Sequence, residues 1–189
     1  MDDVLRWHGP FTFCGPEDSN IFHHELGKQN GIYLWGVPHD GGFLVNHVGE
    51  AGRSFQLRSI DHLRYWLSGF YPIYDAVSFG RGERKAVGGS DKARGMIERI
   101  ADHSSLAVQT TKFLAVLRVL VAPLEADARW RRYIEGAISR ELSNSGKKDI
   151  EEFFERGSRH WKRPTSEPKR VFRIESDLKI HGLTEKISV

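Results

Sequence analysis

The clearest chemical signal in this sequence is an arginine and a histidine spaced four residues apart. In the segment RSFQLRSIDHLRYWLSGF, Arg58 and His62 fall one turn apart on a predicted helix, close to Tyr65. The apolar residues of the segment form a stripe on the opposite side of the helical wheel: Leu57, Ile60, Leu63 and Leu67. A guanidinium suits phosphate binding, and an imidazole suits proton transfer near neutral pH. The pattern indicates either a phosphate-processing site or the solvated face of an ordinary amphipathic helix.

A carboxylate suited to metal binding occurs further along the chain, on a helix predicted over residues 125–144. Glu135, in the context YIEGAISREL, lies at the border of that helix's apolar face, where it can line a cleft and still reach solvent. Carboxylate oxygens are the ligands that Mg²⁺ prefers. Glu141 is the rival carboxylate, and it falls within the apolar face. Spacing alone leaves both a metal-binding role and a plain surface role open for Glu135.

Two glycine-bearing triplets lie upstream of these residues. Gly31-Ile32-Tyr33 opens one short apolar run, and His47-Val48-Gly49 closes the next. The runs 32–37 and 43–48 flank the sequence PHDGG, which predicts a β-hairpin with a five-residue connection. The glycines allow a close approach of the backbone to a substrate or to another side chain.

In this order, the triplets, the Arg-x-x-x-His pair and the helical glutamate resemble the GIY-YIG nuclease superfamily over roughly residues 30–145. The resemblance implies a small α/β domain, in which a short, mostly antiparallel three-stranded sheet is flanked by helices in the order β-β-α-α-β-α. Histidine stands where the family's second triplet begins with tyrosine. The catalytic residues implied by the resemblance are Tyr33, His47, Arg58, His62, Glu135 and Asn144.

The resemblance also implies a mechanism, the hydrolysis of a phosphodiester in one in-line displacement with one Mg²⁺ or Mn²⁺ per site. Glu135 would bind the ion, and Arg58 would neutralise charge on the phosphate or position the attacking water. Tyr33 would act as general base or proton relay, tuned by His62. Imidazole titrates nearer neutrality than a phenol, so His47 is interpreted as a working replacement. The alternatives for His47 are an impaired site and a cross-strand hydrogen bond.

Around this core the sequence predicts further segments. Residues 1–29 are expected to form an irregular leader packed on the core, residues 30–146 the nuclease-like core with an insertion around 70–111, and residues 147–189 a helical and basic C-terminal extension. Within these parts we expect a glycine-rich loop over 71–90, a helix over 90–103, a buried strand over 112–122, a helix over 148–161 and an edge strand over 170–180.

The charge distribution favours an anionic partner. The chain carries a net charge of +3, and Arg156–Arg170 contains six Lys or Arg residues against one acid, with an aromatic residue among them. Such a pattern is typical of phosphate contact with some stacking, and equally of a solvated linker. The insertion is open to the same two interpretations. The residues that we expect to contact nucleic acid are Arg53, Arg81, Arg84, Lys85, Arg159, Trp161, Lys162 and Arg163.

These observations favour a Mg²⁺-dependent endonuclease acting on double- or single-stranded DNA, in a restriction, mobile-element or defence context. One metal site makes one nick, so cutting both strands would need a homodimer or rebinding. The alternative is a catalytically impaired module that binds nucleic acid or regulates another protein. With Cys14 alone there is no disulfide framework, no apolar run reaches the roughly 18 residues of a membrane span, and no secretory signal is present, which favours a cytoplasmic protein.

Overall fold

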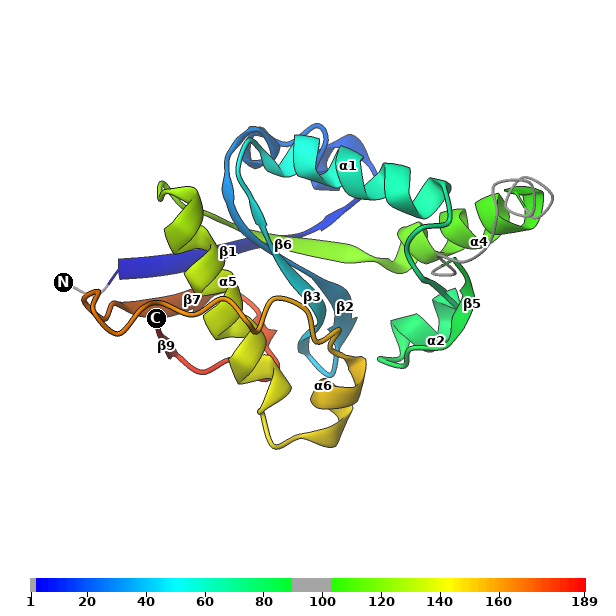
Figure 1. Ribbon diagram of the computed structural model, residues 1–189. Coiled ribbons are helices and arrows are strands. Elements are labelled where there is room, and N and C mark those ends of the chain that lie inside the picture. The colour runs from blue at the N-terminus through cyan, green and yellow to red at the C-terminus, as the bar shows by residue number, and fades with distance from the viewer. Residues whose placement is uncertain (1–2, 90–102) are drawn as a thin grey trace.

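A curved sheet of seven strands organises the molecule, with the strand order β8-β3-β2-β6-β1-β7-β9 (Figure 1). The computed structural model describes residues 3–89 and 103–189. The sheet is mixed, because β1 pairs in parallel with β7, and β3 with β8, while the other neighbours are antiparallel. Its strands are β1 (Asp3–Thr12), β2 (Gly31–His39), β3 (Gly42–Ala51), β6 (Arg118–Pro123), β7 (Val171–Ser176), β8 (Lys179–Ile180) and β9 (Lys186–Ser188).

The expected three-stranded sheet is therefore wrong. The three predicted strands correspond to β2, β3 and β6, but four more strands extend the sheet. The expected irregular leader contains β1, in which the buried Leu5 and Trp7 alternate with more exposed residues, as in a strand with one face on the core. The tail supplies β7, β8 and β9, and β7 is not at the edge because β1 and β9 pair with its two sides.

The predicted hairpin is present, but its connection is shorter than expected. β2 and β3 continue to His39 and Gly42, so only Asp40 and Gly41 form the turn. Both have positive φ, 43° and 70°, which is typical of the Asp-Gly turns whose twist matches that of paired strands. The turn sets the register as far as Gly36, and a one-residue shift between Trp35 and Gly36 then places Tyr33 opposite Gly49.

Helices and one small sheet complete the described structure. The helices are α1 (Phe55–Leu67), α2 (Ala76–Gly80), α4 (His103–Val116), α5 (Ala128–Ser143) and α6 (Lys148–Phe153), with 3-10 turns η1 (Glu17–Ser19) and η2 (Glu25–Lys28). The expected loop over 71–90 instead contains α2 and the paired strands β4 (Ile73–Tyr74) and β5 (Ala86–Gly88). The predicted helix over 90–103 lies, apart from its last residue, outside the described residues.

Two further element boundaries differ from expectation. The predicted strand over 112–122 begins only at Arg118, and the preceding residues belong to α4. A continuous apolar run does not distinguish a buried helix from a buried strand, which explains the error. The predicted helix over 148–161 ends at Phe153. No helix within the described residues is long and apolar enough to cross a membrane.

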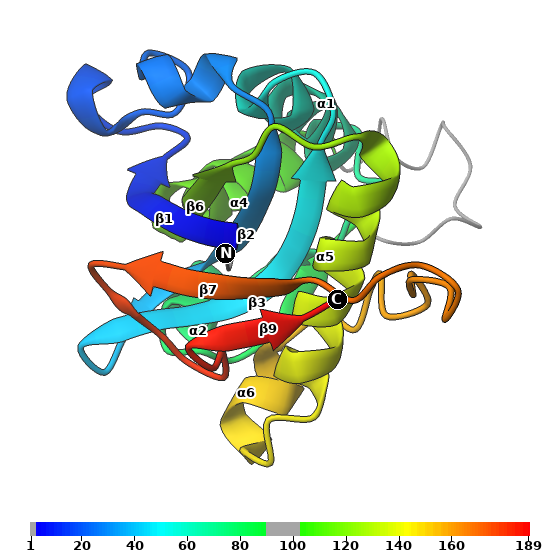
Figure 2. The same ribbon diagram turned by 90° about the vertical axis from the view of Figure 1, so that its left-hand side faces the viewer.

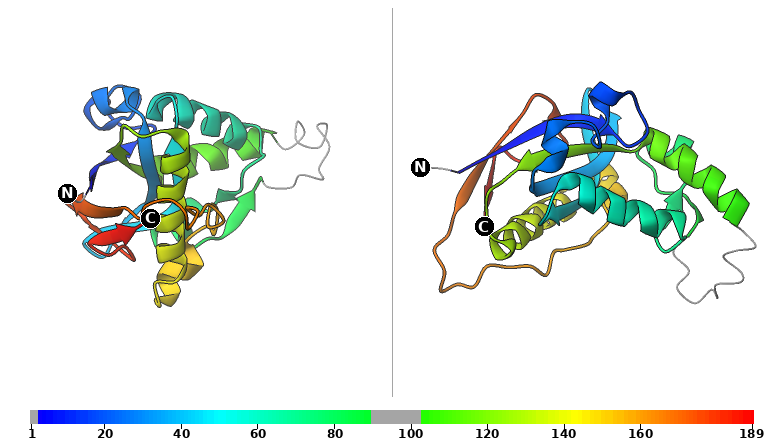
Figure 3. Two further views of the ribbon diagram at one scale, coloured as in Figure 1. Left: turned by 60° about the vertical axis from the view of Figure 1, so that its left-hand side comes forward. Right: turned by 90° about the horizontal axis from the view of Figure 1, so that it is seen from above.

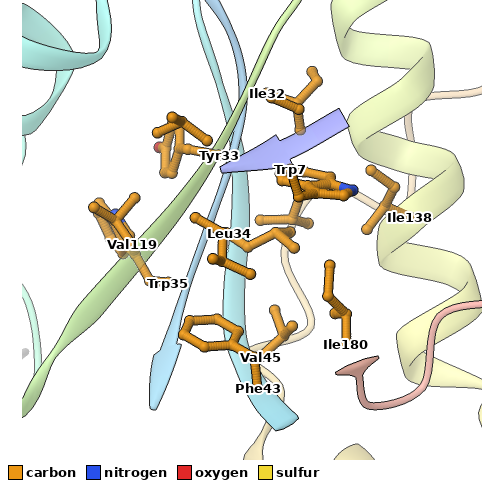
Figure 4. Packing of buried hydrophobic residues seen from close by; sticks show 14 of the residues in the cluster. Trp7, Ile32, Tyr33, Leu34, Trp35, Phe43, Val45, Val119, Ile138 and Ile180 are labelled. Atoms are coloured by element: carbon orange, nitrogen blue, oxygen red, sulfur yellow. The ribbon is translucent and has the colours of Figure 1, made fainter. Parts of the chain in front are cut away.

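The core surrounds the β2–β3 hairpin. Along β2, Ile32 and Leu34 lie on the side that faces Ile138 of α5, whereas Tyr33 and Trp35 point to the other side (Figure 4). Figure 2 shows α5 running beside β3, and Figure 3 shows α1 and α5 from two further directions. Because β8 pairs only with Gly42 and Phe43, the second half of β3 has no strand among the described residues on its edge away from β2. The candidate site forms at this end of β3.

Candidate functional site

Helix α1 buries a different face from the one that its sequence pattern predicts. Its buried residues are Phe55, Ser59, His62 and Trp66. Two leucines of the predicted apolar stripe, Leu57 and Leu67, are 43% and 51% exposed. The expected grouping of His62 with Arg58 on a solvent face is therefore wrong: Arg58 is exposed at the rim, and His62 points into the protein. Ser54 caps the helix by accepting a hydrogen bond from the Leu57 N–H, which fixes where α1 begins.

The partner of His62 is the tyrosine of the first triplet. Tyr33 Oη lies 2.8 Å from His62 Nε2, and each residue is only 3% exposed. The ring of Tyr33 passes directly over Gly49, where an added Cβ would overlap the phenol. The glycine of the second triplet thus makes room for the tyrosine of the first.

The arginine of α1 completes this buried pair. Burial raises the pKa of Tyr33, whereas the charge of Arg58 and its hydrogen bonding to the phenol oxygen lower it. Arg58 therefore acts on the phenol, whose hydroxyl shares a hydrogen bond with His62 Nε2. Burial and the neighbouring Arg58 and His47 lower the pKa of His62 to about 2. The imidazole of His62 is therefore neutral.

A pH dependence of stability follows from the lowered pKa of His62. Unfolded histidine takes up a proton near pH 6.5, whereas folded His62 does so only near pH 2. The unfolded state therefore binds more protons below pH 6.5, and the free energy of unfolding falls as pH falls. We expect a loss of about 1.4 kcal/mol per pH unit from this residue between pH 6 and 4.5. His62→Gln removes this titration and keeps a hydrogen bond to Tyr33, so urea unfolding should show a shallower dependence. Equal slopes in both proteins would contradict the assignment.

Helix α5 brings a carboxylate to the same end of β3. Asp127 caps the helix by accepting from the Trp130 N–H at 2.8 Å. Glu135 follows two turns later and is 7% exposed. Its neighbour Gly136 lets the backbone of Trp161 pass directly over α5, where any Cβ would collide with it. This crossing allows the Ser158 hydroxyl to donate to Glu135.

The electrostatic surroundings of Glu135 leave its carboxylate available. Burial raises its pKa, while the Ser158 hydrogen bond and the charges of His47 and Arg58 lower it; burial dominates. Ser158 engages one carboxylate oxygen, and no hydrogen bond or ion pair is formed by the other within the described residues. The other acidic groups nearby are paired. Glu50 binds Arg131 at 3.0 Å, and Asp61 binds Arg53 at 2.9 Å.

Arg58 and Glu135 line one open, mostly polar cavity of about 520 Å³. The cavity lies where the end of β3, α1, α5 and the segment after α6 meet. Its lining residues are Glu50, Gly52, Arg53, Ser54, Arg58, Asp61, Arg132, Glu135, Ser158 and Trp161. Within residues 3–89 and 103–189, no group of three or more His, Cys, Asp or Glu side chains is arranged to hold a metal ion. A cation here would take one protein carboxylate and complete its shell with water and phosphate oxygens.

The histidine of the second triplet does not line this cavity, although its charge acts on Glu135, and it has a carboxylate partner. His47 Nδ1 is 3.5 Å from Glu155 Oε2, which is an ion-pair distance rather than a strong hydrogen bond. His47 lowers the pKa of Glu155, which stays ionised. The His47 ring lies 6.1 Å from that of Tyr33, and its charge also acts on Glu135.

The remaining predicted site residues divide into three groups. Asn144 is the exposed C-cap of α5 and lines a different pocket with Glu141, so it is not brought to Glu135. Arg53 and Trp161 line the polar cavity, and Trp161 stacks under Arg132 at 5.0 Å. The others lie outside it. Four of them are exposed: Arg81, Lys85, Arg159 and Lys162. The charge of Arg84 acts to lower the pKa of Tyr74 and of Glu155. Arg163 donates hydrogen bonds to the carbonyls of Pro164 and Glu167.

Sequence reasoning missed several residues of the site. Glu50 directly follows the second triplet, and this position next to a predicted site residue could have identified it as part of the site. Ser158 and Glu155 come from the segment after α6, and only the crossing over Gly136 brings that segment near. No local pattern contains this information.

Comparisons with protein-family models, with curated proteins and with solved structures find no match to this chain. The resemblance to the GIY-YIG nuclease superfamily therefore stays a prediction from the sequence.

Proposed function

We propose that this protein is a metal-dependent endonuclease of the GIY-YIG type that hydrolyses phosphodiester bonds in DNA. The observation that carries the proposal is the meeting of Arg58 and Glu135 in one polar cavity, although they come from two helices far apart in the sequence. Beneath Arg58, the Tyr33–His62 pair forms a buried hydrogen-bonded support. The cationic Arg58 can bind a phosphate, and the anionic Glu135 can bind a metal ion. A phosphodiester with a metal ion requires both groups.

Glu135 is the residue that would hold Mg²⁺ or Mn²⁺. Its donor is a hard carboxylate oxygen, and its neighbours Glu50 and Asp61 are already occupied by arginines. When bound, the ion would stabilise negative charge on the scissile phosphate and on the leaving 3′ oxygen. Ser158 fixes the orientation of the carboxylate through its hydrogen bond.

Arg58 binds the phosphate in this proposal. Its guanidinium is exposed at the rim of the cavity on one side and touches the Tyr33 hydroxyl on the other. Tyr33 therefore positions Arg58 rather than removing a proton, because burial raises the pKa of the phenol and its hydroxyl is already hydrogen-bonded to His62. Because Tyr33 fixes the guanidinium of Arg58, this group can stabilise the negative charge of the transition state without first changing its own position.

His47 is the candidate general base. It is half-buried near Glu135, and the ionised Glu155 orients it and compensates the charge of an imidazolium. In the proposed step the water oxygen bonds to phosphorus, and one water proton moves to the free imidazole nitrogen. The bond from phosphorus to the 3′ oxygen breaks, and that oxygen takes a proton from solvent.

Nicking of supercoiled plasmid and cleavage of single-stranded DNA test this proposal. We expect cleavage with Mg²⁺ or Mn²⁺ and none with EDTA. Arg58→Ala should reduce the rate about 10²–10³-fold, which is the usual effect of removing one donor to a developing oxyanion. Arg64→Ala is the matched control, because Arg64 lies on the same helix and its side chain is 76% exposed. Its ion pair with Asp61 is long, at 3.5 Å. Equal rates for the two variants would contradict the role of Arg58.

A second candidate is a module that binds nucleic acid without cleaving it. It is favoured by the burial of Tyr33, which leaves the family's tyrosine unable to reach an attacking water. Salt-sensitive DNA binding with no metal-dependent product would support this alternative.

A further inference from the structure

A second cavity, of about 230 Å³, lies next to the polar one and has a different character. Its walls are mainly aromatic and apolar, whereas the first cavity is mostly polar. The lining residues are Trp35, Asn46, His47, His62, Trp66, Tyr71, Pro72, Tyr74, Phe113, Leu117 and Glu155. An apolar cavity of about 150 Å³ suffices to hold a benzene ring, so this one has room for a planar heterocycle.

One wall of this cavity carries an unused hydrogen-bonding group. His62 is 3% exposed, and its Nε2 is occupied by Tyr33 at 2.8 Å. Its Nδ1 points away from Tyr33 and has no hydrogen-bond partner within the described residues. In a neutral imidazole one nitrogen donates and the other accepts, so Nδ1 is a buried polar atom without a partner whichever nitrogen carries the hydrogen. Such a group favours a ligand that presents a complementary hydrogen-bonding group at this point.

Helix α1 contributes lining residues to both cavities. Arg58 lines the polar cavity, and His62, one turn further along the same helix, lines the aromatic one. The charge of Arg84 acts on Tyr74 and Glu155 in the aromatic wall, so a cation also stands beside this cavity. A polymer held by its phosphate at Arg58 would therefore bring its adjacent nucleoside to the aromatic walls.

We propose that the aromatic cavity holds one unstacked nucleobase next to the scissile phosphate, a proposal that rests on the proposed function. Base faces stack on aromatic side chains with little dependence on sequence, and base edges carry both donors and acceptors, so they can supply the partner that His62 Nδ1 lacks. The half-buried Tyr71 lies 5.7 Å from the His62 ring and 5.9 Å from the Trp66 ring. A base can enter only if it is unpaired, so the substrate is DNA that is single-stranded or locally unpaired at the cut.

The minimal probe is a nucleoside with phosphate on both sides. We would titrate thymidine 3′,5′-bisphosphate, its deoxyadenosine equivalent and the base-free tetrahydrofuran 3′,5′-bisphosphate into the protein in EDTA. Trp35 and Trp66 line the cavity, so intrinsic fluorescence reports binding. We expect at least one nucleotide to bind roughly tenfold or more tightly than the base-free compound, as base stacking provides.

Two variants locate the effect. Tyr71→Leu removes a ring from the cavity and should abolish most of the preference for the nucleotide. Phe70→Leu is the control. Phe70 is next to Tyr71 in the sequence, but its ring is 47% exposed and does not line the cavity. Thermal unfolding of both variants verifies folding. If the protein cleaves DNA but binds all the compounds equally, the base site is overturned and the nuclease proposal stands. If it neither cleaves DNA nor binds any compound, both proposals are overturned.

Discussion

Replacing Glu135 by glutamine is expected to abolish metal-dependent cleavage, with a loss of about 10³-fold or more. Glutamine keeps the size of the side chain and an oxygen that accepts from Ser158, but it removes the negative charge. The stabilisation that a metal ion gives to phosphoryl transfer amounts to several kcal/mol, and each 1.4 kcal/mol is about tenfold in rate. Plasmid nicking measures the loss, and Mn²⁺ titration followed by electron paramagnetic resonance measures ion binding without relying on activity.

Glu141→Gln is the matched control for this experiment. Glu141 lies on the same helix and was the rival carboxylate, but the structure places it against Thr184, whose backbone N–H donates to it at 2.9 Å. We expect cleavage and Mn²⁺ binding close to those of the unchanged protein. Full activity in Glu135→Gln, or the same loss in both variants, would remove Glu135 from its proposed role.

The parts of the site that could be predicted from sequence are those where neighbouring residues, such as turn residues and helix caps, indicate the same element. The sequence PHDGG favours a turn, although only Asp40 and Gly41 form it, and the short β-branched and aromatic runs on both sides favour paired strands. Ser54 and Asp127 mark the starts of the two site helices. These signals act within a few residues, so the elements that carry Tyr33 and Glu135 could be placed in the correct order.

The orientation of α1 could not be predicted in this way. A helical wheel counts His62 as polar and Leu57 as apolar, yet the first is buried and the second exposed. What compensates the burial of His62 is the Tyr33 hydroxyl, 29 residues away in sequence. The size of the sheet has a similar cause. β1 pairs with β7, and Arg170 binds Asp3 across 167 residues, which no local periodicity records.

His47→Ala is expected to reduce cleavage about 10²–10⁴-fold. General base catalysis contributes a factor of this size. The side chain is available for the role because the ionised Glu155 faces its Nδ1 at 3.5 Å and leaves the other nitrogen for a water molecule. The pH profile of cleavage is measured for both proteins alongside the rate.

Two further variants separate a base from a structural histidine. His23→Ala, at an exposed position outside the site, should cleave normally. His47→Tyr supplies the residue that the family resemblance expects, and it should be slower than the unchanged protein because a phenol stays protonated at neutral pH. If His47→Ala keeps both the rate and the pH profile, His47 only supports the hairpin. If the unchanged protein binds DNA and never cleaves it, the histidine in the second triplet belongs to a binding module, and the ion pair with Glu155 has a structural role.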